Sequence, residues 1–136
     1  MPTKITGRCL CGAVEYQAEP VPDLAVKCFC ADCRKSSGGA YVAHLGAVKS
    51  GTKITGEVVT YQHATDSGNQ VTKAFCPTCG SQVYSTNSSR QDMLFLRAST
   101  LDDETAFTPR MSVYASRAPS WNPVDTDIPS FAEMPG

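Results

Sequence analysis

Phe75-Cys76-Pro77-Thr78-Cys79-Gly80 is the most informative segment of this 136-residue chain. Pro77 fixes φ at about −65° in a tight turn, and Gly80 can adopt the positive φ with which a chain curls back beneath a bound metal. Backbone N–H groups in such a turn point at the two sulfurs and favour their thiolate form. The segment therefore predicts half of a tetrahedral zinc site. The alternative, a redox-active dithiol, lacks the strand and helix pattern of thioredoxin-like proteins.

A closed structural zinc site needs four ligands, so a second pair of cysteines must face the first pair. Cys9 and Cys11 lie in the turn Gly7-Arg8-Cys9-Leu10-Cys11-Gly12. The two glycines of this turn permit a tight excursion that aims both sulfurs to one side. We therefore expect a four-thiolate structural zinc site formed by Cys9, Cys11, Cys76 and Cys79.

The chain has seven cysteines, and an odd number cannot pair off completely in disulfides. The remaining three are Cys28, Cys30 and Cys33. Three protein ligands with a vacant fourth position describe a catalytic zinc better than a structural one. Two alternatives stay open: a second structural site completed by His44 or His63, and a redox switch in which the three cysteines oxidise and release metal.

Composition and charge restrict the class of protein. Apolar residues make up 41% of the chain and charged residues 18%, which predicts one globular domain over residues 1–136 rather than a disordered chain. The 12 basic and 13 acidic side chains nearly cancel, so we expect no nucleic-acid partner. The sequence contains no apolar run long enough to span a membrane and no secretory signal. We therefore expect a cytoplasmic protein, in a compartment that keeps cysteines reduced.

Short segments rich in Val, Ile, Thr, Tyr and Phe recur along the chain, and no long window has apolar residues at helical spacing. The pattern predicts an all-β fold with few or no long helices. The expected strands cover residues 3–8, 13–18, 24–29, 40–48, 57–63, 70–75, 82–85, 93–98 and 110–115.

Turn and tail segments complete this expectation. The cluster at residues 66–69 predicts a hairpin connection, and residues 31–37 and 101–105 each predict a helical turn, the second with Thr100 as its N-cap. The proline-rich tail at residues 118–136 is expected to be extended and packed on the domain. Its anchors would be Trp121, Ile128 and Phe131, buried against the sheets.

The three cysteine clusters, in this order, resemble the glutathione-dependent formaldehyde-activating enzyme (GFA) family, which also includes the domain of centromere protein V. The resemblance covers nearly the whole chain, with weaker support from Thr100-Leu101-Asp102-Asp103 and Trp121. It rests on Gly7-Arg8-Cys9-Leu10-Cys11-Gly12-Ala13-Val14-Glu15-Tyr16, Cys28-Phe29-Cys30-Ala31-Asp32-Cys33-Arg34-Lys35 with Ser37-Gly38, and Phe75-Cys76-Pro77-Thr78-Cys79-Gly80-Ser81.

The resemblance implies a β-tent fold, in which small antiparallel sheets are pinned by a four-cysteine zinc site, as in type B methionine sulfoxide reductases. Two zinc ions per chain are implied, the structural one at the four cysteines already grouped and the catalytic one at Cys28, Cys30 and Cys33. The implied reaction is that of a carbon–sulfur lyase: reversible addition of glutathione to formaldehyde, giving S-hydroxymethylglutathione. A three-thiolate site with an open position should lose metal more readily than a closed one, so the second zinc is expected to be partly occupied.

Charge near the second zinc bears on this chemistry. Three thiolates leave zinc with a net charge of about −1, so a nearby cation should help a fourth, anionic ligand to bind. Arg34 and Lys35 are candidates for contact with the substrate or its thiolate, the alternative being a solvated pair. Many members of the family have a histidine where this chain has Phe29, and we expect this change to affect substrate preference rather than metal binding.

Two further functions remain open on the sequence alone. One is a non-catalytic zinc-binding module for a protein partner, and the other is the thiol redox switch. The predicted partners of the enzyme are a small thiol and a small aldehyde. The sequence leaves the oligomeric state open, with a homodimer among the alternatives.

Overall fold

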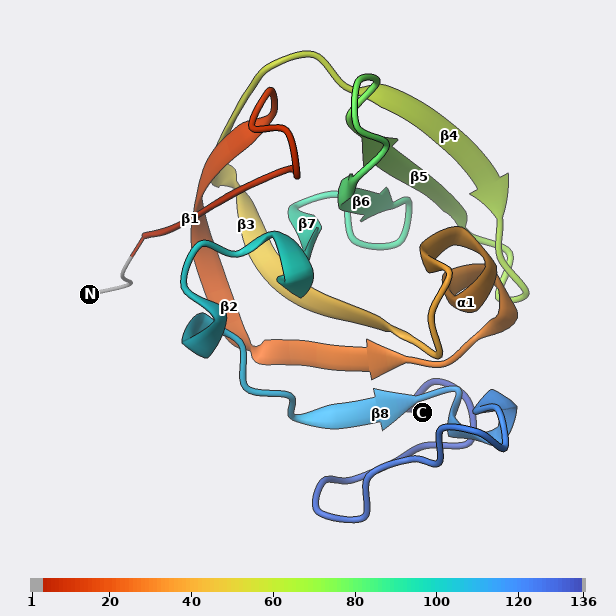
Figure 1. Ribbon diagram of the computed structural model, residues 1–136. Helices are drawn as coiled ribbons and strands as arrows, with labels where there is room; N and C mark the ends of the chain where they lie inside the picture. The colour runs from red at the N-terminus through yellow and green to blue at the C-terminus, as the bar shows by residue number, and fades with distance from the viewer. Residues whose placement is uncertain (1–3, 136) are drawn as a thin grey trace.

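An eight-stranded sheet is the main element of the protein, which a computed structural model describes over residues 4–135. The sheet curves strongly around a central space (Figure 1). Its hydrogen-bonded order is β1-β2-β3-β7-β6-β5-β4, and β8 pairs in parallel with β2 while all other pairs are antiparallel. The all-β prediction is confirmed. The strands are β1 (Ile5–Arg8), β2 (Glu15–Cys28), β3 (Val42–Thr55), β4 (Val59–Ala64), β5 (Gln70–Phe75), β6 (Gln82–Asn87), β7 (Met93–Arg97) and β8 (Met111–Val113).

Strand β2 joins two segments that the sequence predicts as separate strands. Its register with β3 shifts twice, and no pairs form between Pro20 and Ala25. Pro20 and Pro22 have no N–H to donate to a neighbouring strand, so the ladder is interrupted there while the chain stays extended. The sequence thus predicted where the pairing between β2 and β3 is interrupted, but not that β2 continues through this point as one strand.

One α-helix is present in the described residues, α1 (Ala31–Ser37), where the sequence predicts a helical turn. Cys30 is its N-cap and accepts the N–H of Cys33, and Gly38 ends it with φ +75°. Between residues 4 and 135 no helix is long and apolar enough to cross a membrane. The hairpin turn is also found where expected, because residues 65–69 connect β4 to β5.

Three short 3₁₀ helices follow β7, namely η1 (Ala98–Thr100), η2 (Glu104–Ala106) and η3 (Ala115–Arg117). A helical turn overlaps the predicted range 101–105 but spans Glu104–Ala106, and the prediction of Thr100 as its N-cap is wrong. Thr100 belongs to η1, where its hydroxyl donates to the Arg97 carbonyl at 2.7 Å and lies 2.8 Å from the Tyr16 hydroxyl. Its oxygen is therefore engaged, and Asp103 caps η2 instead.

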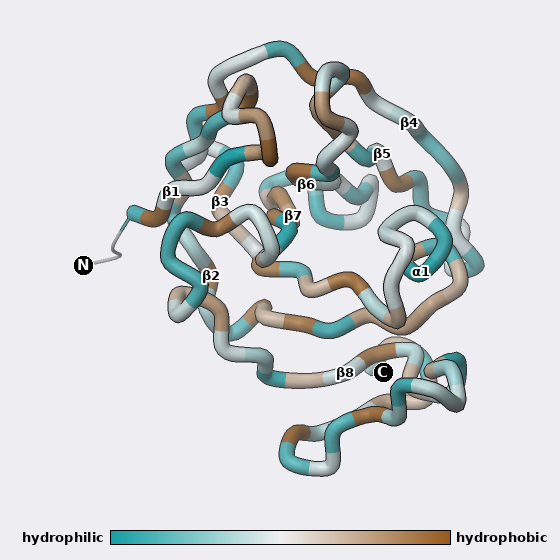
Figure 2. The backbone as a smooth tube through the Cα atoms, viewed as in Figure 1, coloured by the Kyte–Doolittle hydropathy of each residue, from teal (hydrophilic) through white to brown (hydrophobic). Residues whose placement is uncertain are grey.

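Hydrophobic and hydrophilic residues alternate along much of the chain (Figure 2), and buried apolar residues from several strands form the core. The main core cluster includes Cys9 and Cys76 beside residues such as Val14, Leu45 and Leu96. A smaller cluster packs Cys28 and Cys33 against other apolar side chains, among them Val42, Val113 and Phe131. Each cysteine group is therefore built into a separate apolar cluster.

The C-terminal segment runs beside β8, below the sheet in the view of Figure 1. Ser112 donates its N–H to the Pro129 carbonyl at 3.0 Å and accepts that of Phe131 at 2.9 Å. Ile128 and Phe131 are half-buried as expected. Trp121 is 72% exposed, so its predicted burial is wrong. Backbone bonds to β8 and the Phe131 ring hold the segment, and Trp121 lines an open pocket instead of joining the core.

Candidate metal centres

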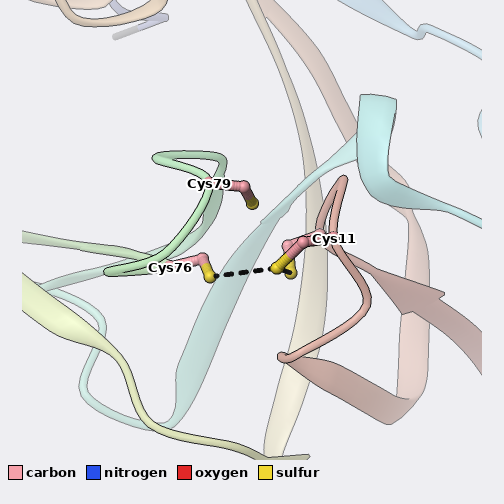
Figure 3. Close-up of side chains that lie close together, drawn as sticks. Cys11, Cys76 and Cys79 are labelled. Atoms are coloured by element: carbon pink, nitrogen blue, oxygen red, sulfur yellow. Dashed lines mark hydrogen bonds between the residues drawn. The ribbon is translucent and has the colours of Figure 1, made fainter.

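The four-cysteine cluster joins two turns that are far apart in sequence (Figure 3). Cys9 and Cys11 follow β1, Cys76 and Cys79 lie between β5 and β6, and the four sulfurs are within 4.8 Å of one another. The Sγ of Cys11 lies 3.7 Å from both the Cys9 and the Cys76 sulfur. Thiolates bound tetrahedrally at 2.3 Å from zinc would be separated by about 3.8 Å. The donor set and its spacing therefore fit zinc.

Hydrogen-bond donors surround these sulfurs. The N–H of Val14 donates to the Cys9 sulfur at 3.3 Å, and the Ser81 hydroxyl lies 3.2 Å from the Cys79 sulfur. The hydroxyl and N–H of Ser81 lower the pKa of Cys79 to about 5. Gly80 has φ +77°, as the turn requires. The turn at residues 76–81 therefore favours the thiolate form of Cys79, while desolvation and the neighbouring sulfurs raise the pKa of Cys11 to about 11.

The three-cysteine cluster lies at the junction of β2 and α1. Cys28 ends β2, Cys33 lies in α1, and the sulfurs of both and of Cys30 are within 4.8 Å of one another. Cys28 and Cys33 are each 8% exposed, and Cys30 is half-buried. Cys30 therefore offers the most open approach to the cluster.

Charge in this cluster is concentrated on one sulfur. Hydrogen bonds from Cys28 and Cys33 lower the pKa of Cys30, while the hydrogen bond to Cys30 raises the pKa of Cys28 to about 12. Hydrogen bonds to Cys28 and Cys30 raise the pKa of Cys33 as well. A negative charge on Cys30 thus disfavours ionisation of Cys28 and Cys33. A bound cation would offset this repulsion and allow all three to be thiolates. This chemistry fits a metal ion.

His44 lies beside the cluster, although the sequence spacing gave no sign of this. Its Nε2 is 3.6 Å from the Cys33 sulfur and its Nδ1 is 3.1 Å from Nη1 of Arg97. It does not belong to the group of three sulfurs that lie within 4.8 Å of one another. His63 on β4 lies outside both groups, with its Nδ1 3.9 Å from a carboxylate oxygen of Asp32.

Two buried cations flank this region. Arg97 is 4% exposed and Lys73 is 8% exposed, and neither forms an ion pair with a carboxylate in the described part of the chain. Burial lowers the pKa of Arg97 to about 10. Lys73 donates to the Asp32 carbonyl and the Ser36 hydroxyl of α1. The sequence analysis identified neither residue as part of the site. For Arg97 a signal was present, because this charged residue directly follows the apolar run at residues 93–96.

The basic residues that the sequence favoured have other surroundings. Arg34 donates its Nε–H to the Phe29 carbonyl at 3.2 Å, and Lys35 is exposed. Phe29 is 2% exposed and its ring lies 5.2 Å from that of Tyr41, centroid to centroid. Neither Arg34 nor Lys35 lines the pocket described next.

A pocket of about 760 Å³ lies between the Cys9 turn, the end of α1 and the start of β3. Arg8 and Arg97 provide its cations, and serine and amide side chains provide most of its other polar groups. Among residues 4–135, no acidic residue lines it. The three-cysteine cluster does not line this pocket. Val42 lies on the border, since it lines the pocket and packs against Cys28 and Cys33.

Comparison with known proteins identifies the family of this chain. The family model described as "Glutathione-dependent formaldehyde-activating enzyme" matches residues 4–117, which include all seven cysteines. A Halomonas elongata protein named "Putative glutathione-dependent formaldehyde-activating enzyme" is 26% identical over 128 residues, covering 90% of this chain and 82% of that protein. A crystal structure of a Rhodobacter sphaeroides protein superimposes with a TM-score of 0.59 at 25% identity, covering 72% of this chain and 88% of that one. The chain belongs to the glutathione-dependent formaldehyde-activating enzyme family.

Proposed function

We propose that this protein is a zinc-dependent carbon–sulfur lyase that catalyses the reversible addition of glutathione to formaldehyde. The proposal is carried by one observation, a cluster of three thiols that could hold a metal, which Val42 connects to a pocket lined by two arginines. Family membership supports the general activity. Cys9, Cys11, Cys76 and Cys79 would hold a structural zinc, and Cys28, Cys30 and Cys33 a second zinc at which the reaction takes place.

Zinc at the second site would supply a Lewis acid with a free position, where an incoming thiol binds and loses its proton more readily. The new bond joins the thiol sulfur to the aldehyde carbon, the C=O double bond becomes a single bond, and the proton ends on that oxygen. The protein would hold the thiol at Cys30, the open side of the cluster. Reduced cysteines are needed throughout, so we place the reaction in the cytosol.

The pocket would bind the peptide part of glutathione. Its volume of about 760 Å³ is within the usual range for small-molecule sites. A guanidinium group has five N–H donors, and one of the two on Nη2 of Arg97 has no acceptor in the described residues. That N–H is available for a glutathione carboxylate. Arg8 is already paired with Asp102 and Glu15, so we assign the main contact to Arg97 rather than to Arg8 or Arg34.

The reaction can be followed directly by exchange spectroscopy. With ¹³C-formaldehyde and glutathione at equilibrium, exchange NMR measures how fast the free aldehyde and S-hydroxymethylglutathione interconvert. We expect the exchange rate above background to rise in proportion to protein concentration and to disappear in Cys30→Ser. Binding of glutathione without faster exchange would contradict the lyase proposal and favour a binding module.

Thiols that lack carboxylates should be poorer substrates than glutathione. A charge-assisted hydrogen bond contributes about 1.5–3 kcal/mol, which corresponds to roughly a 10- to 100-fold change in affinity. We therefore expect kcat/KM for cysteamine to fall by at least about 10-fold below that for glutathione. High salt should reduce this difference in kcat/KM, because it screens the attraction between the arginine and the glutathione carboxylate. Equal kcat/KM values would show that the pocket does not select carboxylates.

A further inference from the structure

We propose that Arg97 and His44 are positioning residues for the second metal site: a hydrogen-bonded chain from Arg97 through His44 orients the Cys33 sulfur as a metal ligand. The inference rests on the proposed function for the presence of the metal. It adds two residues outside the cysteine clusters, with a stated role for each. Both sit on strands, and neither was indicated by the sequence motifs.

The hydrogen-bond chemistry fixes the direction of this chain. A guanidinium group can only donate, so the His44 Nδ1, which lies 3.1 Å from Nη1 of Arg97, must accept. An imidazole whose Nδ1 accepts carries its proton on Nε2. That nitrogen is 3.6 Å from the Cys33 sulfur. His44 therefore donates to Cys33, and this hydrogen bond fixes the position of the sulfur relative to the other two cysteines.

The same proton gives His44 a role different from that of a ligand. A nitrogen that bears a proton has no lone pair in the ring plane for a metal. His44 would therefore not be a ligand, and a metal held by the three cysteines would have its fourth position free for an exogenous group. This separates the catalytic arrangement from a closed site of three thiolates and one imidazole, the alternative that the sequence left open.

Charge balance gives Arg97 its second role. A buried cation needs a compensating anion, and Arg97 has no carboxylate partner within the described residues. Three thiolates around a divalent ion have a net charge of about −1. The cluster is linked to Arg97 by a single side chain, His44. Arg97 therefore supplies the counter-charge, and Lys73 beneath α1 adds a second cation on that side.

Both side chains are held rigidly in place. His44 on β3 and Arg97 on β7 are direct partners in the antiparallel register. The Gln82 side-chain oxygen accepts from Nε and Nη2 of Arg97 at 3.1 and 2.9 Å, and the Ser85 hydroxyl accepts from Nη1 at 3.1 Å. The Phe95 ring stands edge-on to His44, at 6.4 Å and 90°. The chain is therefore preorganised before any metal binds.

Metal affinity tests the proposal without any substrate. Cobalt(II), whose visible absorption bands report tetrahedral thiolate coordination, is titrated into metal-free protein under reducing conditions. Loss of a group that orients a metal ligand typically weakens binding by about 10- to 100-fold. We expect a loss of this size at the second site, and none at the four-cysteine site, in Arg97→Gln and His44→Leu. His44→Gln, which keeps an N–H donor near Nε2, should recover much of the affinity.

Matched controls separate this role from general effects. Arg110→Gln removes an exposed arginine whose ion-pair partner within the described residues is Asp23, and His63→Gln removes the other histidine of the chain. Both should bind two cobalt ions as the native protein does. Native affinity at the second site in Arg97→Gln and His44→Leu would overturn the inference while leaving the lyase proposal standing. Absence of a second metal in the native protein would overturn both.

The proton position on His44 can be read from the native protein even if the variants fold poorly. Long-range ¹H–¹⁵N NMR distinguishes the two ring nitrogens, and His63→Gln leaves His44 as the only imidazole signal. We expect the proton on Nε2 in the zinc-loaded protein. A proton on Nδ1, or a metal bound to Nε2, would contradict the proposed chain.

Discussion

Cys76→Ser is expected to unfold the chain. Cys76 is fully buried in the main core cluster, and its sulfur is one of the four that converge between two distant turns. Binding of structural zinc contributes about 10–16 kcal/mol to the folding of small zinc domains. The free energy of unfolding of a whole domain is only about 5–15 kcal/mol, so loss of the zinc can remove all of it. A serine hydroxyl is a poor replacement for a thiolate ligand.

The loss can be measured by far-UV circular dichroism, thermal unfolding and zinc content. Thr78→Ser is the matched control, because Thr78 is an exposed residue of the same turn whose side chain is outside the cluster. It should behave like the native protein. A folded Cys76→Ser protein with an unchanged Tm would show that the four cysteines do not hold the fold together.

Cys30→Ser should remove the second metal and the activity while leaving the fold. Cys30 is half-buried, and its sulfur caps α1 by accepting the N–H of Cys33 at 3.3 Å. Serine is among the best N-cap residues, so its hydroxyl can take over this bond and α1 should persist. The site is left with two thiolates, too few for a stable zinc centre.

Comparison of the two serine variants tests the division of labour between the clusters. Circular dichroism should be native for Cys30→Ser and lost for Cys76→Ser, while the formaldehyde exchange rate falls to background in both. Equal loss of structure in the two variants would contradict the separation into a structural and a reactive site.

The sequence was sufficient for features that depend on local spacing. The C-x-x-C turn at residues 76–79 and the C-x-C turn at residues 9–11 each place two sulfurs through local backbone geometry alone. The structure brings these two turns together and keeps the other three cysteines apart, as the spacing predicts. Alternation of apolar residues likewise located most strands.

Features that depend on strand pairing could not be read in this way. His44 and Arg97 are 53 residues apart and meet only because β3 pairs with β7 in one register. Trp121 was expected to be buried on the strength of its size alone, yet the segment that carries it is held elsewhere, at Pro129 and Phe131. Thr100 was predicted to cap a helical turn, but its hydroxyl instead contacts Tyr16, which is 84 residues away in the sequence.

The most direct test of this account is zinc content per chain, in protein purified under reducing conditions. The native protein is compared with a variant in which Cys28, Cys30 and Cys33 are all serine. We predict a fall from about two zinc ions to about one, with circular dichroism unchanged. A value of about one in both proteins would contradict the account, because it would mean that the three-cysteine cluster holds no zinc.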